Sequence, residues 1–222
     1  MAIILAIACI AVLYSQHIIQ YYPTARQWHW VNVYWLLPAI PFLLLQRKAG
    51  LIGPFDSITD TSKRYGLPLF TGFIFGLLDL IVLKFLQHPE PYQRLPAFLQ
   101  PFPYSIFLYS AGAFEVEIYY RLIPITAAML LGRWLLNGKY AMQIFWAIAI
   151  LTSLREPIEQ LPSQNIWFII YSFVSGFAMN FFQAYYYKEA GFAAAISTRL
   201  GHYLVWHILL GIFVQYVELG GK

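Results

Sequence analysis

Charged residues are scarce in this sequence: Asp, Glu, Lys and Arg together form 11% of its 222 residues, against 60% hydrophobic and 19% aromatic residues. Because ordinary soluble domains contain about 25% charged residues, this composition excludes such a domain. Basic clusters and nucleic-acid-binding motifs are also lacking, so the net charge of +4 indicates membrane lipids rather than nucleic acid as partners. The one cysteine, Cys9, excludes an internal disulfide bond.

Internal repeats and long polar linkers are absent as well, which favours a single transmembrane domain over residues 1–222. The chain instead contains continuous apolar runs of the roughly 20 residues that a helix needs to cross a membrane. We therefore expect an all-α polytopic membrane protein with about seven (six to eight) transmembrane helices in one bundle, and a kink at Pro38 and Pro41. The predicted spans cover residues 2–22, 28–46, 66–87, 103–132, 140–154, 165–187 and 191–217.

Lysine and arginine residues are unevenly distributed between the two ends of these spans. With a cytoplasmic N-terminus, the cytoplasmic connections contain Arg47, Lys48, Lys63, Arg64, Arg133, Lys139 and Lys188. The opposite side then contains Arg26, Arg94, Arg155 and Lys222. Because positive residues accumulate on the cytoplasmic side of membrane proteins, this distribution predicts a cytoplasmic N-terminus. We expect an integral protein of a prokaryotic inner membrane or an organellar-type membrane.

Charged residues interrupt the fourth predicted span at Glu115, Glu117 and Arg121. Glu117 and Arg121 are four residues apart, in the favourable order for an ion pair on a helix, whereas Glu115 projects from another side. Pro124 has no N–H for the carbonyl of Tyr120, which leaves a backbone acceptor beside the pair. A charge at mid-bilayer costs at least about 2.5–3.5 kcal/mol. The pair is therefore either a structural ion pair or part of a functional site.

Two further places combine charged residues with apolar surroundings. Arg155, Glu156 and Glu159 follow the fifth span, and Arg199 and His202 lie in the last one. The prolines near the first group favour an interfacial loop over a buried site. His202 taken alone is typical of a hydrogen-bonded core histidine. Taken together, the three places predict a shared polar pocket inside the bundle.

The order of these three places resembles the CPBP family of intramembrane proteases, which includes CAAX-processing enzymes and bacterial abortive-infection and bacteriocin-processing proteins. That family carries Glu-Glu-x-x-x-Arg in one helix, Phe-x-x-x-His in a later one and a His-x-x-x-Asn-like motif in the last. Glu117 and Arg121 match the second Glu and the Arg of the first motif. The resemblance covers about residues 105–210. It implies N-terminal helices and loops over residues 1–100, then a CAAX-protease-like core over 101–217.

Three positions depart from the family pattern. The first Glu, which the family's enzymes are thought to use to activate water, falls on Val116. The His of the second motif falls on Arg155, and the Asn-like position of the last motif falls on Trp206, although its histidine is present as His202. Valine cannot accept a proton, and arginine can neither act as a base nor bind a metal ion.

The resemblance thus implies a remnant catalytic site of Glu117, Arg121 and His202. Catalytic zinc has three protein ligands, so we expect no metal or cofactor unless Glu115 or Glu156 supplies a missing ligand. Such a rescue needs a register shift, and one residue on a helix is a rotation of about 100°. A simpler arrangement places Arg155 in the former catalytic cavity, paired with Glu117. The residues left to bind an anionic or amphiphilic ligand are Arg155, Glu156, Arg199 and Trp206.

These departures favour a homologue that is proteolytically inactive or impaired and acts by binding. It would serve as a scaffold, assembly factor or stabiliser of a membrane protein complex, or hold a lipid or pigment. One alternative is an active intramembrane CAAX-type endopeptidase that uses Glu117 and His202. Another is a structural subunit of a larger membrane complex. In the binding and subunit hypotheses the partner is another membrane protein or complex.

Overall fold

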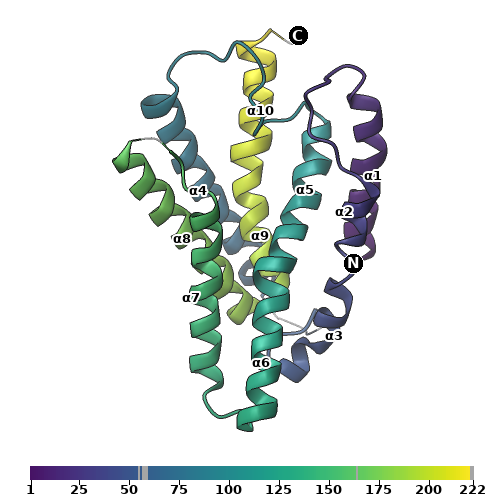
Figure 1. Ribbon diagram of the computed structural model, residues 1–222, viewed down its shortest axis with the longest axis vertical. Helices are drawn as coiled ribbons and strands as arrows, with labels where there is room; N and C mark the ends of the chain where they lie inside the picture. Colours follow the sequence, from purple (N-terminus) through teal and green to yellow (C-terminus); the bar gives the residue numbers. More distant parts are fainter. Residues whose placement is uncertain (55, 57–59, 164, 221–222) are drawn as a thin grey trace. The chain divides into compact units, whose positions relative to one another are not determined.

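The computed structural model describes residues 1–54, 56, 60–163 and 165–220, and all regular secondary structure in this part of the chain is helical (Figure 1). The predicted all-α class is therefore confirmed. The elements in chain order are α1 (Ala2–Ile18), α2 (Trp30–Tyr34), α3 (Ala39–Ala49), η1 (Ser62–Gly66), α4 (Leu67–Val82), η2 (Leu83–Gln87), α5 (Tyr104–Glu117), η3 (Ile118–Leu122), α6 (Ile123–Leu136), α7 (Ala141–Glu159), α8 (Ile166–Ala190), α9 (Phe192–Tyr203), η4 (Leu204–Leu209), α10 (Leu210–Phe213) and η5 (Val214–Glu218), where η marks a π-helical turn.

Two of the predicted spans differ from the observed helices. The second span is broken rather than kinked, because α2 ends at Tyr34 and α3 begins only after Pro38. The fifth span continues to Glu159, beyond the predicted end at residue 154, and contains Pro157 within the helix. Since Pro157 lies in the last turn, its missing N–H removes one helical hydrogen bond without ending the helix. Residues 155–159 are thus helical, and the predicted loop at this place is wrong.

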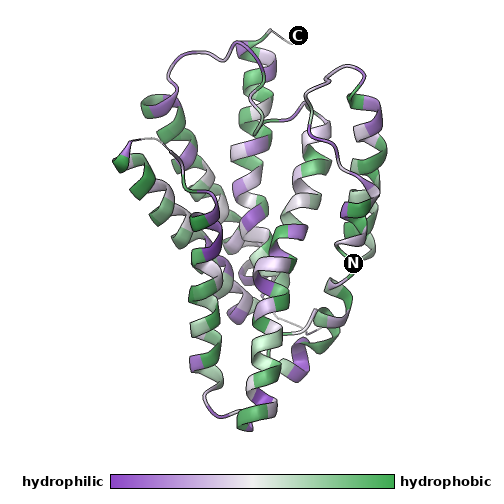
Figure 2. Ribbon diagram, in the orientation of Figure 1, coloured by the Kyte–Doolittle hydropathy of each residue, from purple (hydrophilic) through white to green (hydrophobic). Residues whose placement is uncertain are grey.

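Three helical stretches are long and apolar enough to cross a membrane: Ser62–Gln87, Ile166–Ala190 and Phe192–Glu218. They contain 26, 25 and 27 residues, compared with the roughly 20 residues that a helix needs to cross the hydrocarbon core. The shorter helix Ala2–Ile18 is also apolar. In Figure 2 the helical ribbons are coloured mostly apolar, and polar residues occur in the connecting loops and at several places within the helices. This distribution is typical of helices that face lipid.

Contacts divide the chain into two compact units. Unit 1 comprises Met1–Leu37, Thr71–Glu115 and Leu200–Lys222, and unit 2 comprises Pro38–Phe70 and Val116–Arg199.

In unit 2, α7 packs against α6 and α8, while α3 packs against α6 (Figure 1). A chain of buried polar side chains joins three of these helices. Gln46 in α3 donates Nε2–H to the Tyr187 hydroxyl in α8 at 2.7 Å, and Thr126 in α6 shares a hydrogen bond of 2.9 Å with the same hydroxyl. Because buried polar groups are costly without partners, these bonds select one packing of the three helices.

In unit 1, the helix that contains Gly76 lies very close to the helix that contains His202. A Cβ atom added at Gly76 would lie 2.9 Å from the His202 carbonyl oxygen and 2.9 Å from the Val205 Cβ atom. A side chain at this position would therefore separate the two backbones. Further along the same C-terminal stretch, Leu210 and Val214 form a buried cluster with Leu99.

Asp56 lies outside the membrane-spanning candidates, in the connection between α3 and η1. It accepts the Gly53 backbone N–H at 2.7 Å and pairs with Arg47. The Gly53 hydrogen bond, followed by the Arg47 side chain, lowers the Asp56 pKa below its ordinary value of 3.8. Because the folded-state pKa is lowered, the stabilisation is present above about pH 3.8 and is lost as the pH falls through the folded pKa.

We therefore expect the Gly53 amide to be protected from hydrogen exchange at neutral pH and to lose this protection only below pH 3.8, the ordinary Asp56 value. In Asp56→Asn the protection factor should no longer change with pH in this range. The measurement is amide exchange at Gly53, corrected for the intrinsic rate at each pH. A wild-type protection factor that falls near pH 5 would contradict the assignment.

Candidate functional site

A cluster of buried charged side chains lies within unit 2. Glu117 ends α5, Arg121 lies in η3, Glu156 lies in α7 and Arg199 lies in α9. Glu117, Arg121 and Arg199 are 0% exposed, and Glu156 is 8% exposed. The two acids balance the two arginines, so the cluster has no net charge. This balance lowers the cost of burial, since isolated ions inside a protein are strongly disfavoured.

Arg199 joins both carboxylates. It donates Nε–H to Glu117 Oε1 at 2.6 Å. Its two terminal nitrogens bind Glu156 through both oxygens, Nη1 to Oε1 at 2.9 Å and Nη2 to Oε2 at 2.6 Å. A two-point contact of this kind matches the planar guanidinium to the planar carboxylate and is stronger than a single hydrogen bond. Arg199 is thus the central member of the cluster.

Arg121 is held by oxygen atoms of α7 and α8. It donates Nη1–H to the Thr152 carbonyl at 3.2 Å and Nη2–H to the Gln183 side chain at 3.1 Å. Nη2 also donates to Asn180, through the side-chain oxygen and, at 3.0 Å, through the carbonyl. Arg199 donates to the same Gln183 oxygen at 3.2 Å. The neutral amide oxygens therefore lie between the two positive groups and reduce their repulsion.

The proline effect expected near Arg121 is present. Pro124 has no N–H for the Tyr120 carbonyl, and this carbonyl accepts Arg121 Nη1–H at 2.9 Å. The turn before Pro124 is π-helical over Ile118–Leu122, and π turns inside α-helices are frequent at functional sites. The local sequence thus positions Arg121 through its own helix as well as through α7 and α8.

The predicted direct pair of Glu117 with Arg121 is wrong among the described contacts. Glu117 binds Arg199 instead, and Arg121 uses its terminal nitrogens on carbonyl and amide oxygens. The physical reason is that Arg199 brings its charge from another helix directly onto the carboxylate. Meanwhile α8 offers Arg121 several acceptors at once.

The predicted pairing of Arg155 with Glu117 is also wrong. The Arg155 side chain is 51% exposed and forms an ion pair of 2.8 Å with Glu159 on the same helix. Its guanidinium carbon lies 4.2 Å from the centre of the Tyr120 ring. Its neighbour Glu156 enters the buried cluster in its place. Adjacent residues on a helix point about 100° apart, so only one of the two can face the interior.

Asn180 and Gln183 of α8 are members of the site that the sequence interpretation missed. They are 1% and 0% exposed. The sequence does contain a signal for them: two amide side chains three residues apart in an apolar helix lie on one face, which indicates a polar contact there. A neutral amide in an apolar segment is a weaker indication of a site than a charge, but in this cluster the two amides accept hydrogen bonds from both arginines.

The other predicted site residues belong to unit 1. His202 Nε2 lies 2.8 Å from Asp79 Oδ2, and Asp79 is only a weak signal in the sequence. Trp206 stacks on Phe98, with ring centres 5.4 Å apart. Glu115 lies in the part of α5 assigned to unit 1. Within unit 2, the structure thus brings together Glu117, Arg121, Glu156 and Arg199.

The cluster also limits its own chemistry. Both Glu156 oxygens and one Glu117 oxygen accept hydrogen bonds from a guanidinium that stays protonated in proteins. These three oxygen atoms are therefore poorly placed to accept a proton from water or to bind a cation. Within the cluster, three buried atoms have no hydrogen-bond partner among the described residues: Glu117 Oε2, Arg121 Nε and Gln183 Nε2.

Comparison of the chain with protein-family models, with curated proteins and with solved structures gives no match.

Proposed function

We propose that this chain is an integral membrane protein with a seven-span, CPBP-like bundle that has lost proteolytic activity and acts by binding another membrane protein. In this role it stabilises or helps to assemble a membrane complex. The observation that carries the proposal is the position of Arg199, which donates hydrogen bonds to both buried carboxylates of unit 2. Both Glu156 oxygens and Glu117 Oε1 are occupied in this way, and an oxygen that already accepts a guanidinium N–H is a poor general base, because a base needs a free lone pair directed at the water.

The identity of the residue before Glu117 also supports the loss of activity. Val116 stands where the family resemblance implies the catalytic carboxylate, and valine has no proton acceptor. The described cluster instead has the features of a structural element: burial, balanced charge and members on five helical elements, α5, η3, α7, α8 and α9. Such networks select one arrangement of helices, which suits a protein that presents a fixed surface to a partner.

The first test is a proteolysis assay. Purified protein in liposomes is incubated with a quenched fluorescent peptide that ends in a prenylated CAAX sequence. We expect wild type, Glu117→Ala and Glu156→Ala to give the same background signal, since neither carboxylate takes part in a reaction. Comparison with the two variants separates true turnover from a contaminating protease. Cleavage by wild type that falls at least about 100-fold in Glu117→Ala would overturn the proposal, because loss of a general base has an effect of this size.

The second test addresses binding. In mildly solubilised native membranes, the protein should migrate on a native gel in an assembly larger than one copy of the chain. A monodisperse single copy under the same conditions would count against a scaffold or subunit role. This result is independent of the proteolysis assay.

An active endopeptidase is the second candidate, and three observations favour it. Arg155 is exposed and does not fill the interior. Glu156 and Glu117 bind the same residue, Arg199, so Glu156 is a carboxylate near Glu117 that could replace a catalytic group missing from the family pattern. Glu117 Oε2 also has no hydrogen-bond partner among the described residues. In this candidate Arg199 must leave the carboxylates before catalysis. The proteolysis assay above distinguishes the two functions directly.

A further inference from the structure

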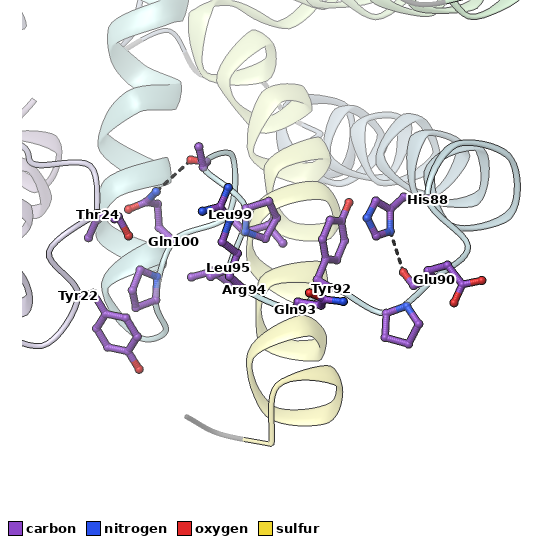
Figure 3. A pocket seen from close by; sticks show the side chains of 15 residues that line it. Tyr22, Thr24, His88, Glu90, Tyr92, Gln93, Arg94, Leu95, Leu99 and Gln100 are labelled. Atoms are coloured by element: carbon purple, nitrogen blue, oxygen red, sulfur yellow. Dashed lines mark hydrogen bonds between the residues drawn. The ribbon is translucent and has the colours of Figure 1, made fainter.

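A cavity of about 700 Å³ lies in unit 1, between residues 22–25 and residues 88–101. Figure 3 shows Tyr22 and Thr24 at one end, His88 and Glu90 at the other, and Arg94 between them. Cavities of roughly 300–1,000 Å³ are typical of small-molecule sites. Neither the proposed function nor the buried cluster uses this cavity.

The walls of the cavity are held in place by hydrogen bonds. Gln100, which is 3% exposed, joins the two walls: its Oε1 accepts the Arg26 backbone N–H at 2.7 Å and its Nε2 donates to the Ala97 carbonyl at 3.0 Å. On the other side, the Tyr92 backbone N–H donates to Glu218 at 2.8 Å. The His88 and Tyr92 rings stack at 4.0 Å. A site fixed before binding loses less entropy when a ligand enters.

The polar groups that line the cavity favour an anion. Arg94 is exposed to the cavity, and neither its guanidinium nor the Thr24 hydroxyl has an ion pair or hydrogen bond among the described residues. The nearby Lys84 is already neutralised by Glu218 at 2.6 Å, which leaves Arg94 as the cation offered to a ligand in this wall. One positive charge matches a phosphodiester, which carries one negative charge. The Glu90 carboxylate at the far end can accept hydrogen bonds from hydroxyl or ammonium groups of the same ligand.

The cavity lies next to the ends of two membrane-spanning candidates, and this position indicates that the anion is part of a membrane lipid. Residues 88–101 follow Gln87, where one membrane-spanning candidate ends, and they contact Glu218, where another ends. Phe85 and Leu86, just before the cavity, are 74% and 62% exposed and apolar. The ends of transmembrane helices lie at the depth of lipid headgroups, while exposed apolar residues next to them face acyl chains.

We propose that this cavity binds the headgroup of a glycerophospholipid. The Arg94 guanidinium and the Thr24 hydroxyl bind the phosphodiester, Glu90 accepts hydrogen bonds from the polar end of the headgroup, and the acyl chains run along Phe85 and Leu86.

The test uses full-length protein in an uncharged detergent and dioctanoyl phosphatidylglycerol as the probe, with binding measured by titration calorimetry. We expect Arg94→Gln to bind the probe at least about tenfold more weakly, since hydrogen bonds to charged groups have effects of this size. Arg133→Gln is the matched control, because Arg133 is also an exposed arginine, lies at the end of α6 and gives the same change in net charge. This control should bind as wild type does.

Two further probes identify the source of the phosphate. Dioctanoylglycerol has the same chains without the phosphate, and glycerol 3-phosphate has the phosphate without the chains; both should bind at least about tenfold more weakly than the lipid. Equal binding of either compound, or equal weakening by Arg94→Gln and Arg133→Gln, would overturn the proposal. If Arg94→Gln does not fold, Thr24→Val takes its place, and an affinity unchanged from wild type would again overturn it.

Discussion

Replacement of Arg199 by methionine is expected to lower the free energy of unfolding by about 3–5 kcal/mol, the range measured when one partner of a buried ion pair is removed. The reason lies in the geometry of the cluster. Glu117 and Glu156 would both stay buried, with their hydrogen bonds to Arg199 lost and a negative charge each. Methionine has a similar length and leaves little empty volume, so the effect reports the loss of charge and hydrogen bonds rather than a cavity.

The measurement is unfolding of the purified protein by titration with a denaturing detergent, followed by tryptophan fluorescence. Arg133→Met serves as the matched control, because Arg133 is exposed at the end of α6; its effect should stay within about 0.5 kcal/mol. A double variant that adds Glu156→Gln to Arg199→Met should recover part of the loss, since the cluster then holds one acid, Glu117, and one arginine, Arg121, and has no net charge. An Arg199→Met variant whose free energy of unfolding lies within about 1 kcal/mol of wild type, close to the effect of a surface substitution, would show that the cluster is not structural.

Replacement of Gly76 by leucine is expected to destabilise the protein by about 1–3 kcal/mol or more, the cost of forcing extra volume into a packed interior. The first added carbon would lie 2.9 Å from the His202 carbonyl oxygen, and a backbone atom cannot rotate away as the end of a side chain can. The helices around Gly76 and His202 would have to separate. The hydrogen bond of 2.8 Å between His202 and Asp79 connects the same pair of helices and should break with them.

Gly112→Leu provides the control, because an added carbon at Gly112 would meet nothing within 4 Å. It lies in the interior of α5, where leucine favours the helix over glycine by up to about 1 kcal/mol. The control should therefore be neutral or slightly stabilising in the same unfolding assay. Equal destabilisation by both variants would mean that leucine disturbs these helices for a reason other than the close approach at Gly76.

Most of the helices could be predicted from the sequence because they coincide with long apolar runs. The exceptions are local. Before Pro38 the apolar run continues although α2 has ended. Hydropathy does not report the missing N–H and the fixed φ angle of a proline. At Pro157 the opposite error occurs, because a proline in the last turn is compatible with the helix.

The charged members of the buried cluster were predictable, but their pairing was not. Glu117, Arg121, Glu156 and Arg199 are conspicuous as charges in apolar segments. Their partners depend on which helix faces which, and this is decided by packing between segments distant in the sequence. The choice between Arg155 and Glu156 shows the difficulty most clearly. The two are adjacent, and only the rotation of α7 places the acid inside and the arginine at the surface.

The hydrogen bond between Arg199 and Glu117 joins residues 82 positions apart in the chain, and this separation has a consequence for synthesis. Chains are made from the N-terminus, so Glu117 and Glu156 are synthesised before Arg199. Until then the cluster holds two acids and one arginine, Arg121, and this excess of negative charge opposes burial of the cluster. Synthesis of Arg199 completes the charge balance and allows the helices to close around the cluster.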